Sequence, residues 1–196
     1  MRKCYLLIFL IGFLIMACGD QTASSPEGGE TVPVTMDLEN YDDGTGISRA
    51  YRMGTDNLSE EGSVLDGKKH GSWVAYNDDG SIASITTYHV GVKEGVAVTF
   101  DKQGYAEVKS FYHNDMLNGN YLVFKRKRVI ESRNYRDGEL EGIVRKYYEN
   151  GEIMEEAPYK EGNLDGIAKW YDQEGNLSIA YEYHDGELVN KEAEVD

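Results

Sequence analysis

A run of four basic side chains is the first candidate for binding chemistry in this sequence. It accounts for four of the 20 Lys and Arg residues in a chain whose formal net charge is −15. Clustered ammonium and guanidinium groups bind carboxylates, phosphates and lipid headgroups. We therefore predict a docking site for an anionic partner or for lipid headgroups, with an irregular, solvated turn as the alternative interpretation. The run consists of Lys125, Arg126, Lys127 and Arg128.

Aromatic side chains form a second candidate binding surface. Tyr and Trp offer a flat apolar ring together with a hydrogen-bonding group, so they stack on sugar rings or peptide side chains. Because a single-layer sheet has only one well-covered face, we expect some of these rings to be exposed. Ordinary packing of the sheet is the alternative. The residues that we assign to this candidate platform are Trp73, Tyr121 and Trp170, with Tyr148 and Tyr181 as further members.

A column of basic residues contains three histidines, but its spacing argues against a metal site. A basic residue follows a recurrent tyrosine five times, as His89, His113, Arg136, Lys160 and His184. Equivalent positions in successive hairpins lie two strands apart, roughly 9–10 Å. The ligands of one zinc ion all lie about 2 Å from it. We therefore expect a solvated cationic row that leads into a turn, and neither a metal nor another cofactor.

Catalytic chemistry finds little support in the sequence. The two cysteines are Cys4 and Cys18, and no Ser, His and Asp residues stand in a recognisable catalytic frame. Most carboxylates fall in turns, where we expect them to stay solvated. We predict that the protein is not an enzyme.

The first residues have the organisation of an export signal. Two basic residues precede an apolar run at 6–16, which is shorter than the roughly 20 residues of a membrane-spanning helix. Ile15-Met16-Ala17-Cys18 resembles the lipobox of bacterial lipoproteins; an ordinary secretory signal containing a cysteine is the alternative. The resemblance implies cleavage before Cys18, attachment of acyl chains to Cys18, and anchoring to the cell envelope. Because Gly19 follows, we expect the outer membrane of a Gram-negative bacterium.

The charge of the chain excludes one class of partner. Residues 1–17 hold two basic and no acidic residues, so their removal changes the net charge from −15 to −17. Affinity for nucleic acid comes mainly from neutralising phosphates with Lys and Arg, so such a surface repels duplex nucleic acid. We predict that the protein binds no nucleic acid.

From residue 67 onward the chain repeats every 23 or 24 residues. Turn signals recur about every dozen residues, which leaves no room for a normal helix, and β-branched and aromatic residues dominate the segments between them. Each repeat therefore predicts one β-hairpin. A glycine column contains Gly71, Gly95, Gly119, Gly142 and Gly166. An aromatic column contains Tyr76, Phe100, Phe124, Tyr147 and Tyr171. A tyrosine column contains Tyr88, Tyr112, Tyr135, Tyr159 and Tyr183.

These columns predict an all-β protein: a single extended, twisted antiparallel meander of β-hairpin repeats, of about twelve strands. We expect the aromatic and tyrosine columns to line the same, better-covered face. The predicted divisions are a signal peptide (1–17), the lipidated Cys with a disordered linker (18–34), a degenerate N-terminal repeat or cap (35–66), five repeats plus a half-repeat (67–190), and an acidic tail (191–196).

The spacing of glycine and aromatic residues carries a family resemblance. Gly71-Ser72-Trp73-Val74-Ala75-Tyr76, and the segments 142–147 and 166–171, resemble the bacterial variant of MORN-type repeats. The arrangement over residues 50–190 is similar to the YwqK family, whose members carry the label of antitoxins of toxin–antitoxin systems. This resemblance implies a repeat sheet that mediates protein or lipid contact. We therefore predict a lipid-anchored, non-enzymatic envelope module that binds a protein partner, with an immunity role against an envelope-acting toxin as its most specific form. An envelope scaffold that contacts lipid or polysaccharide is the alternative.

Overall fold

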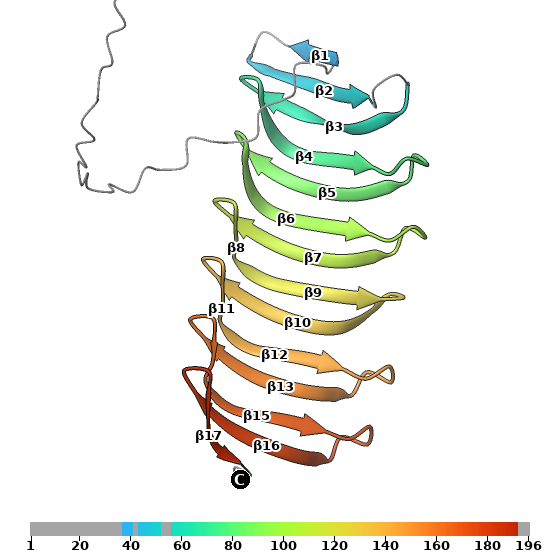
Figure 1. Ribbon diagram of the computed structural model, residues 1–196. Coiled ribbons are helices and arrows are strands. Elements are labelled where there is room, and N and C mark those ends of the chain that lie inside the picture. The colour runs from blue at the N-terminus through green and yellow to red at the C-terminus, as the bar shows by residue number, and fades with distance from the viewer. Residues whose placement is uncertain (1–36, 41–42, 52–55, 192–196) are drawn as a thin grey trace, which may run out of the picture.

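The protein folds as one open antiparallel sheet of 17 strands. The structure is a computed structural model that describes residues 37–40, 43–51 and 56–191; the predicted signal peptide and linker, with Cys18, lie outside these residues. Each strand pairs with its neighbours in chain order, so the hairpins stack from the N-terminal to the C-terminal end (Figure 1). The described residues contain no helix. This arrangement confirms the predicted all-β meander of hairpins.

In chain order the strands are β1 (Asp37–Asn40), β2 (Thr45–Tyr51), β3 (Leu58–Leu65), β4 (Lys68–Tyr76), β5 (Ile82–His89), β6 (Val92–Phe100), β7 (Ala106–His113), β8 (Met116–Leu117), β9 (Gly119–Lys125), β10 (Arg128–Arg136), β11 (Glu139–Leu140), β12 (Gly142–Tyr147), β13 (Ile153–Lys160), β14 (Asn163–Leu164), β15 (Gly166–Tyr171), β16 (Leu177–His184) and β17 (Glu187–Lys191).

Three of the five strands beyond the expected twelve arise from one local feature. In the third, fourth and fifth repeats the first strand is divided by a bulge just before the column glycine, which creates the short strands β8, β11 and β14. Gly119, Gly142 and Gly166 have φ angles of 101°, 88° and 112°, which L side chains rarely adopt. The glycine column is therefore required by a bulge that recurs in each repeat.

Two kinds of turn close the hairpins, one at each margin of the sheet (Figure 1). Tight two-residue turns, drawn at the left, have positive φ at both residues, as expected for type I′ turns. They are Asp66-Gly67, Val90-Gly91, Asn114-Asp115, Asp137-Gly138, Glu161-Gly162 and Asp185-Gly186. Each is also tied to an earlier part of the sheet; for example, the Gly91 N–H donates to the Lys69 carbonyl at 2.7 Å.

Longer loops close the opposite margin, drawn at the right in Figure 1. In the loop between β4 and β5, the Asn77 N–H donates to the Ser81 carbonyl at 2.8 Å, and the Asp79 carboxylate accepts the Ser81 N–H at 2.9 Å. The turn between β9 and β10 is the exception, since only two residues separate the paired Lys125 and Arg128. The basic run thus replaces a longer loop with a tight turn.

The aromatic and tyrosine columns lie on opposite faces of the sheet. Gly71 pairs with Tyr88, and Trp73 pairs with Thr86, so Tyr88 shares the face of Trp73. Tyr76 stands an odd number of residues from both Gly71 and Trp73, and side chains alternate along a strand. The prediction that both columns line one face is therefore wrong, because the odd spacing separates them.

A small core lies at the N-terminal end of the sheet, on the tyrosine-column face. Val64, Trp73 and Tyr88 are buried there in mutual contact. The Trp73 indole N–H donates to the Ser63 carbonyl at 2.7 Å, which satisfies its polar atom. Val64 stands two residues before the tight turn that follows β3. Tyr88 holds the same position before the next tight turn.

Candidate functional site

The basic turn has an unusual backbone for its composition. Arg126 and Lys127 have φ angles of 49° and 71°, and the flanking Lys125 and Arg128 are paired across the hairpin. This geometry is that of a type I′ turn, for which Asn-Gly is preferred because side chains with a Cβ resist the left-handed conformation. The tight turn therefore carries a conformational cost, and it projects consecutive basic side chains from the sheet margin.

All four basic side chains of this turn are exposed. The Lys125 ammonium lies 3.4 Å from Glu149 Oε1, and the Arg128 guanidinium donates to the Glu149 carbonyl. The Lys127 ammonium lies 4.8 Å from the centre of the Tyr105 ring. Within the described residues, the Arg126 guanidinium forms no ion pair, so its charge is available to a ligand.

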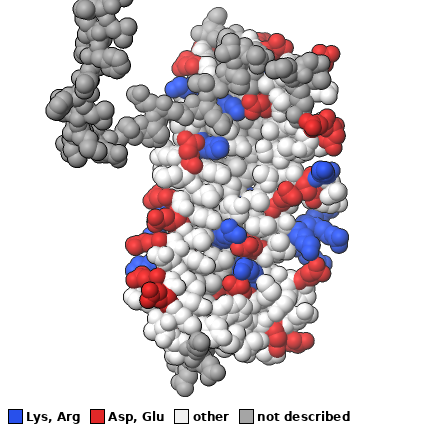
Figure 2. Space-filling model, viewed as in Figure 1, with Lys and Arg blue, Asp and Glu red and all other residues white. Residues whose placement is uncertain are grey.

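Two hollows flank Arg126. The first, of about 260 Å³, is lined by Lys125, Arg126, Arg128, Ile130, Tyr148 and Glu149. The second, of about 640 Å³, is lined by Asp101, Gln103, Tyr105, Arg126 and Lys127. Figure 2 shows the basic turn as the largest blue group on this view, at the margin where the β9–β10 turn lies. The structure thus brings all four predicted basic residues to one site, with an aromatic ring on each side.

This arrangement can hold an anionic group. Guanidinium and ammonium groups on two sides of a hollow bind a carboxylate or phosphate by charge-assisted hydrogen bonds. The rings of Tyr105 and Tyr148 and the side chain of Ile130 add apolar contact area. The site is therefore suited to an acidic side chain that belongs to a larger, partly apolar partner.

The predicted aromatic platform is only partly present. Trp73 is 3% exposed, because it fills the N-terminal core, so it cannot belong to an exposed surface. Tyr121 and Trp170 are half-buried and stand in different hairpins, on β9 and β15. The Tyr121 ring packs 5.7 Å from the centre of Tyr135, and Trp170 packs 5.6 Å from Tyr181. The structure does not bring Trp73, Tyr121 and Trp170 together.

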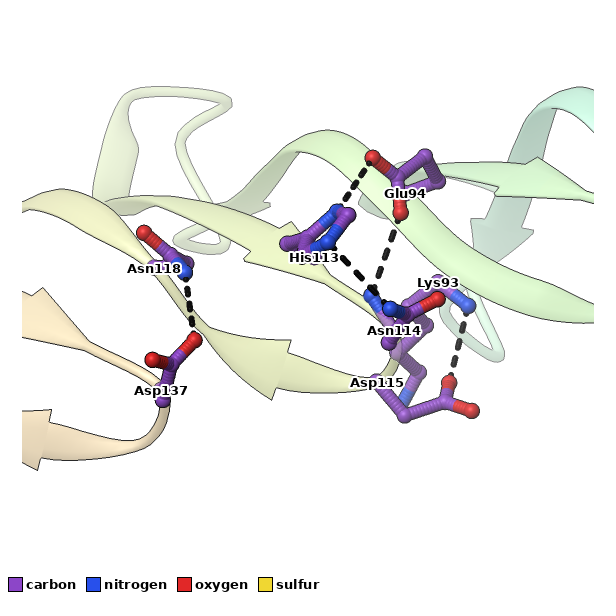
Figure 3. A network of polar contacts seen from close by, with 7 residues as sticks. All are labelled: Lys93, Glu94, His113, Asn114, Asp115, Asn118 and Asp137. Carbon is purple, nitrogen blue, oxygen red and sulfur yellow. Dashed lines mark hydrogen bonds and ion pairs between the residues drawn. The ribbon is translucent and has the colours of Figure 1, made fainter. Parts of the chain in front are cut away.

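The cationic row does not gather its histidines around one point. Instead, a polar residue just before the column glycine holds the tight turn of the same repeat. The Glu94 carboxylate contacts His113 Nδ1 at 3.0 Å and accepts the Asn114 N–H at 3.1 Å. One hairpin further on, the Asn118 amide donates to Asp137 Oδ1 at 3.0 Å (Figure 3).

The pKa values of Glu94 and His113 shift as expected for an ion pair. Hydrogen bonds from His113 and the Asn114 backbone lower the pKa of Glu94, and the hydrogen bond and charge of Glu94 raise the pKa of His113. Asp165 makes a similar contact in the last full repeat, 3.0 Å from His184 Nδ1. There Asp165, His184 and Asp185 place possible ligand atoms within 4.8 Å of one another, on the surface.

Sequence reasoning missed these acidic partners. The signal was the position before the column glycine, which holds Glu94, Glu141 and Asp165 in three of five repeats. The Glu141 carboxylate accepts the Glu161 N–H at 3.2 Å, so the contact recurs. These acids serve to fix the tight turns.

No helix within the described residues is long and apolar enough to cross a membrane.

The repeat pattern of the chain matches a known family model. Residues 140–161 and 164–188 match the model described as the MORN repeat variant. These are MORN-type repeats. The matched MORN segments span the fourth and fifth hairpins of the regular series, which contain Gly142 and Gly166.

Comparison with curated proteins gives no match for this chain. Among solved structures, the chain is similar to the crystal structure of TarM, with a TM-score of 0.37 and 14% sequence identity. The similarity covers 56% of this chain and 21% of TarM, so the chain spans about a fifth of the length of that protein.

Proposed function

We propose that this MORN-repeat protein is a lipid-anchored module of the cell envelope that binds a protein partner without catalysing a reaction. The observation that carries the proposal is the basic turn between β9 and β10, where Arg126 lines two hollows. MORN repeats support a repeat-based binding module. The acyl anchor is inferred from the lipobox resemblance at Cys18.

The charge distribution favours an acidic partner and fixes how it docks. The basic turn is a positively charged patch on a protein that has 35 Asp and Glu residues against 20 Lys and Arg residues. An acidic partner is attracted to this turn and repelled by most of the remaining surface, which gives orientation more than raw affinity. An antitoxin or immunity role of the YwqK type, against a toxin that acts in the envelope, is the most specific form of this proposal.

A capture experiment tests the proposal with the full-length protein in detergent. The wild type is compared with a variant in which Arg126 and Lys127 are replaced by Asn and Gly. This replacement keeps the type I′ turn, because Asn-Gly is its preferred pair, and it removes two charges. Glu161→Asn is the matched control, since it changes one residue of another tight turn.

We expect the wild type and the Glu161→Asn control to capture the same acidic envelope protein, and the Asn-Gly variant to lose it. Purified partner must then bind the wild type directly, with an affinity that falls as salt increases. Equal capture by all three proteins contradicts the docking role of the basic turn.

The basic turn also favours the alternative of a scaffold that contacts anionic lipid headgroups. Vesicles with and without phosphatidylglycerol separate the two functions. If the wild type binds the anionic vesicles and captures no protein, while the Asn-Gly variant does neither, the lipid function replaces the protein function.

A further inference from the structure

A further hollow, whose lining includes no residue of the basic turn, lies on the tyrosine-column face over β5, β6, β7 and β9. Its volume is about 220 Å³. It forms because one position of the repeat changes size. Two residues after the column glycine, the first and third repeats carry Trp73 and Tyr121, whereas the second carries Ala97. The residues paired with Ala97 on each side are also small, Thr86 and Ser110.

The hollow contains hydroxyl groups that lack partners. Ser110 is only 5% exposed, and within the described residues its hydroxyl forms no hydrogen bond. The hydroxyls of the half-buried Ser84 and Thr86 and of the exposed Thr99 also line the hollow and form no hydrogen bond within these residues, but they are open to solvent, so only the Ser110 hydroxyl is buried. A buried hydroxyl without a partner is costly and uncommon, which indicates that a ligand or ordered water completes it. Hydroxyls both donate and accept, so they match a ligand that is itself rich in hydroxyls.

Two tyrosine rings border the same hollow. Tyr112 and Tyr121 are among its lining residues. The Tyr121 ring is fixed from its surroundings: Tyr135 packs edge-on at 5.7 Å, and the Arg133 guanidinium carbon lies 5.3 Å from the ring centre. A flat, fixed ring beside hydrogen-bonding groups is the arrangement on which a small polar ring can stack.

The charge of the hollow is positive in an acidic protein. Its lining contains Lys93 and neither Asp nor Glu. The Lys93 ammonium lies 5.7 Å from the centre of the Tyr112 ring, and it forms no salt bridge within the described residues. An anionic substituent on the ligand would therefore be attracted here.

We infer that this hollow binds a carboxylate-bearing saccharide, with the sugar ring against Tyr121 and Tyr112, its hydroxyls on the Ser and Thr side chains, and its carboxylate near Lys93. A peptide strand fits less well. Peptides that add to a sheet need an unpaired edge, whereas β5 and β6 are each paired on both sides.

The test is binding of trigalacturonate, compared with neutral galactotriose, to the full-length protein in detergent, measured by calorimetry. Three variants probe the site. Ala97→Trp fills the hollow with a residue that the first repeat already holds at the same position. Tyr121→Ala removes the ring, and Lys93→Met removes the charge. The Asn-Gly variant of the basic turn is the control, because it does not touch this hollow.

We expect trigalacturonate to bind the wild type and the control equally. Ala97→Trp should abolish this binding, and Tyr121→Ala and Lys93→Met should each weaken it by about tenfold or more, as for a central aromatic or charged contact. Galactotriose should bind the wild type about tenfold more weakly. Absence of trigalacturonate binding to the folded wild type overturns the inference, and equal binding of the two saccharides overturns the role of Lys93. Because the basic-turn variant is expected to lose partner capture and to keep saccharide binding, failure of this inference is distinct from failure of the proposed function.

Discussion

The indole ring of Trp73 lies directly against Gly62, the residue with which it pairs across β3 and β4. A Cβ atom on Gly62 would lie 2.5 Å from three ring atoms, closer than non-bonded atoms approach. The missing side chain of Gly62 therefore makes room for the largest ring of the N-terminal core. The ring in turn covers a glycine that would otherwise weaken a strand.

Replacement of Gly62 by Ala should destabilise this end of the sheet. The indole has to move away from the new methyl group, and overpacking of this kind costs about 1–3 kcal/mol. Urea unfolding followed by the fluorescence of Trp73, in a Trp170→Phe background, measures the effect. Ser63→Ala is the control, because the bond from the Trp73 indole uses the Ser63 carbonyl and not its side chain. Equal stability of Gly62→Ala and the control would contradict the close contact.

The burial of Trp73 could not be predicted from the repeat pattern. Glycine and aromatic spacing was sufficient to predict hairpins of about 24 residues. The burial of one ring depends on what lies across the strand, and Gly62 belongs to a hairpin whose repeat pattern is degenerate. The register that places Gly62 under Trp73 does not follow from the repeat pattern, so the sequence predicts Trp73 in an exposed platform, whereas the ring is buried.

Replacement of Arg126 and Lys127 by Asn and Gly should stabilise the protein while removing its proposed docking site. Arg126 and Lys127 both have positive φ. Asn and Gly adopt the same conformation with less strain, which should stabilise the fold by about 1 kcal/mol per residue. The urea midpoint should rise without a change in the slope of the transition. A lower midpoint would show that the contacts of Lys127 with Tyr105, or of Arg126 with its surroundings, outweigh the backbone strain.

The Glu94–His113 contact should make the tight turn sensitive to pH. The raised pKa of His113 means that its contribution is complete below its unfolded value of about 6.5 and is lost as pH rises through the folded value. The lowered pKa of Glu94 means that its contribution is present above its unfolded value of about 4.3 and is lost as pH falls through the folded value. The turn is therefore held best between these two unfolded values.

An NMR titration of the His113 ring measures this effect. Glu94→Gln should lower the pKa of His113 more than Asp137→Asn does, because Glu94 supplies the hydrogen bond and the larger charge effect. The side chains of His113 and Glu94 are 57% and 41% exposed, so the difference should shrink as salt increases. An unchanged pKa in Glu94→Gln would contradict the contact.

The tight turns also explain why part of the site could not be predicted. Dipeptides such as Asp137-Gly138 and Asp185-Gly186 are sufficient by themselves to predict type I′ turns. The residue that holds each turn, such as Glu94 for Asn114, is 20 residues away in the sequence. That contact depends on the bulge before the column glycine, which directs the Glu94 side chain toward the turn. The alternation of side chains along a strand does not reveal where a bulge lies, so the contact could not be predicted.

Replacement of Cys18 by Ser should abolish attachment of the protein to the envelope. If the lipobox resemblance holds, Cys18 carries the acyl chains, and a labelled palmitate added to growing cells should enter the wild type and not the Cys18→Ser variant. Cys4→Ser is the matched control, because Cys4 lies in the segment that is predicted to be removed. Labelling that persists in Cys18→Ser, or that disappears in Cys4→Ser, would contradict the predicted anchor.

Gly142 and Gly166 occupy equivalent positions in successive repeats but have different surroundings. Gly142 and Gly166 both hold positive φ, 88° and 112°, so replacement of either by Ala should cost about 1 kcal/mol or more from backbone strain. Their surroundings differ: a Cβ on Gly166 would lie 3.0 Å from Pro158 Cγ, whereas one on Gly142 meets nothing within 4 Å. Gly166→Ala should therefore lower the free energy of unfolding more than Gly142→Ala, because the Pro158 ring is rigid and cannot move aside. Urea unfolding of the two variants and of the double variant Gly166→Ala/Pro158→Ala measures the difference. If removal of the Pro158 ring does not bring the cost at Gly166 down to that at Gly142, the contact is not its cause.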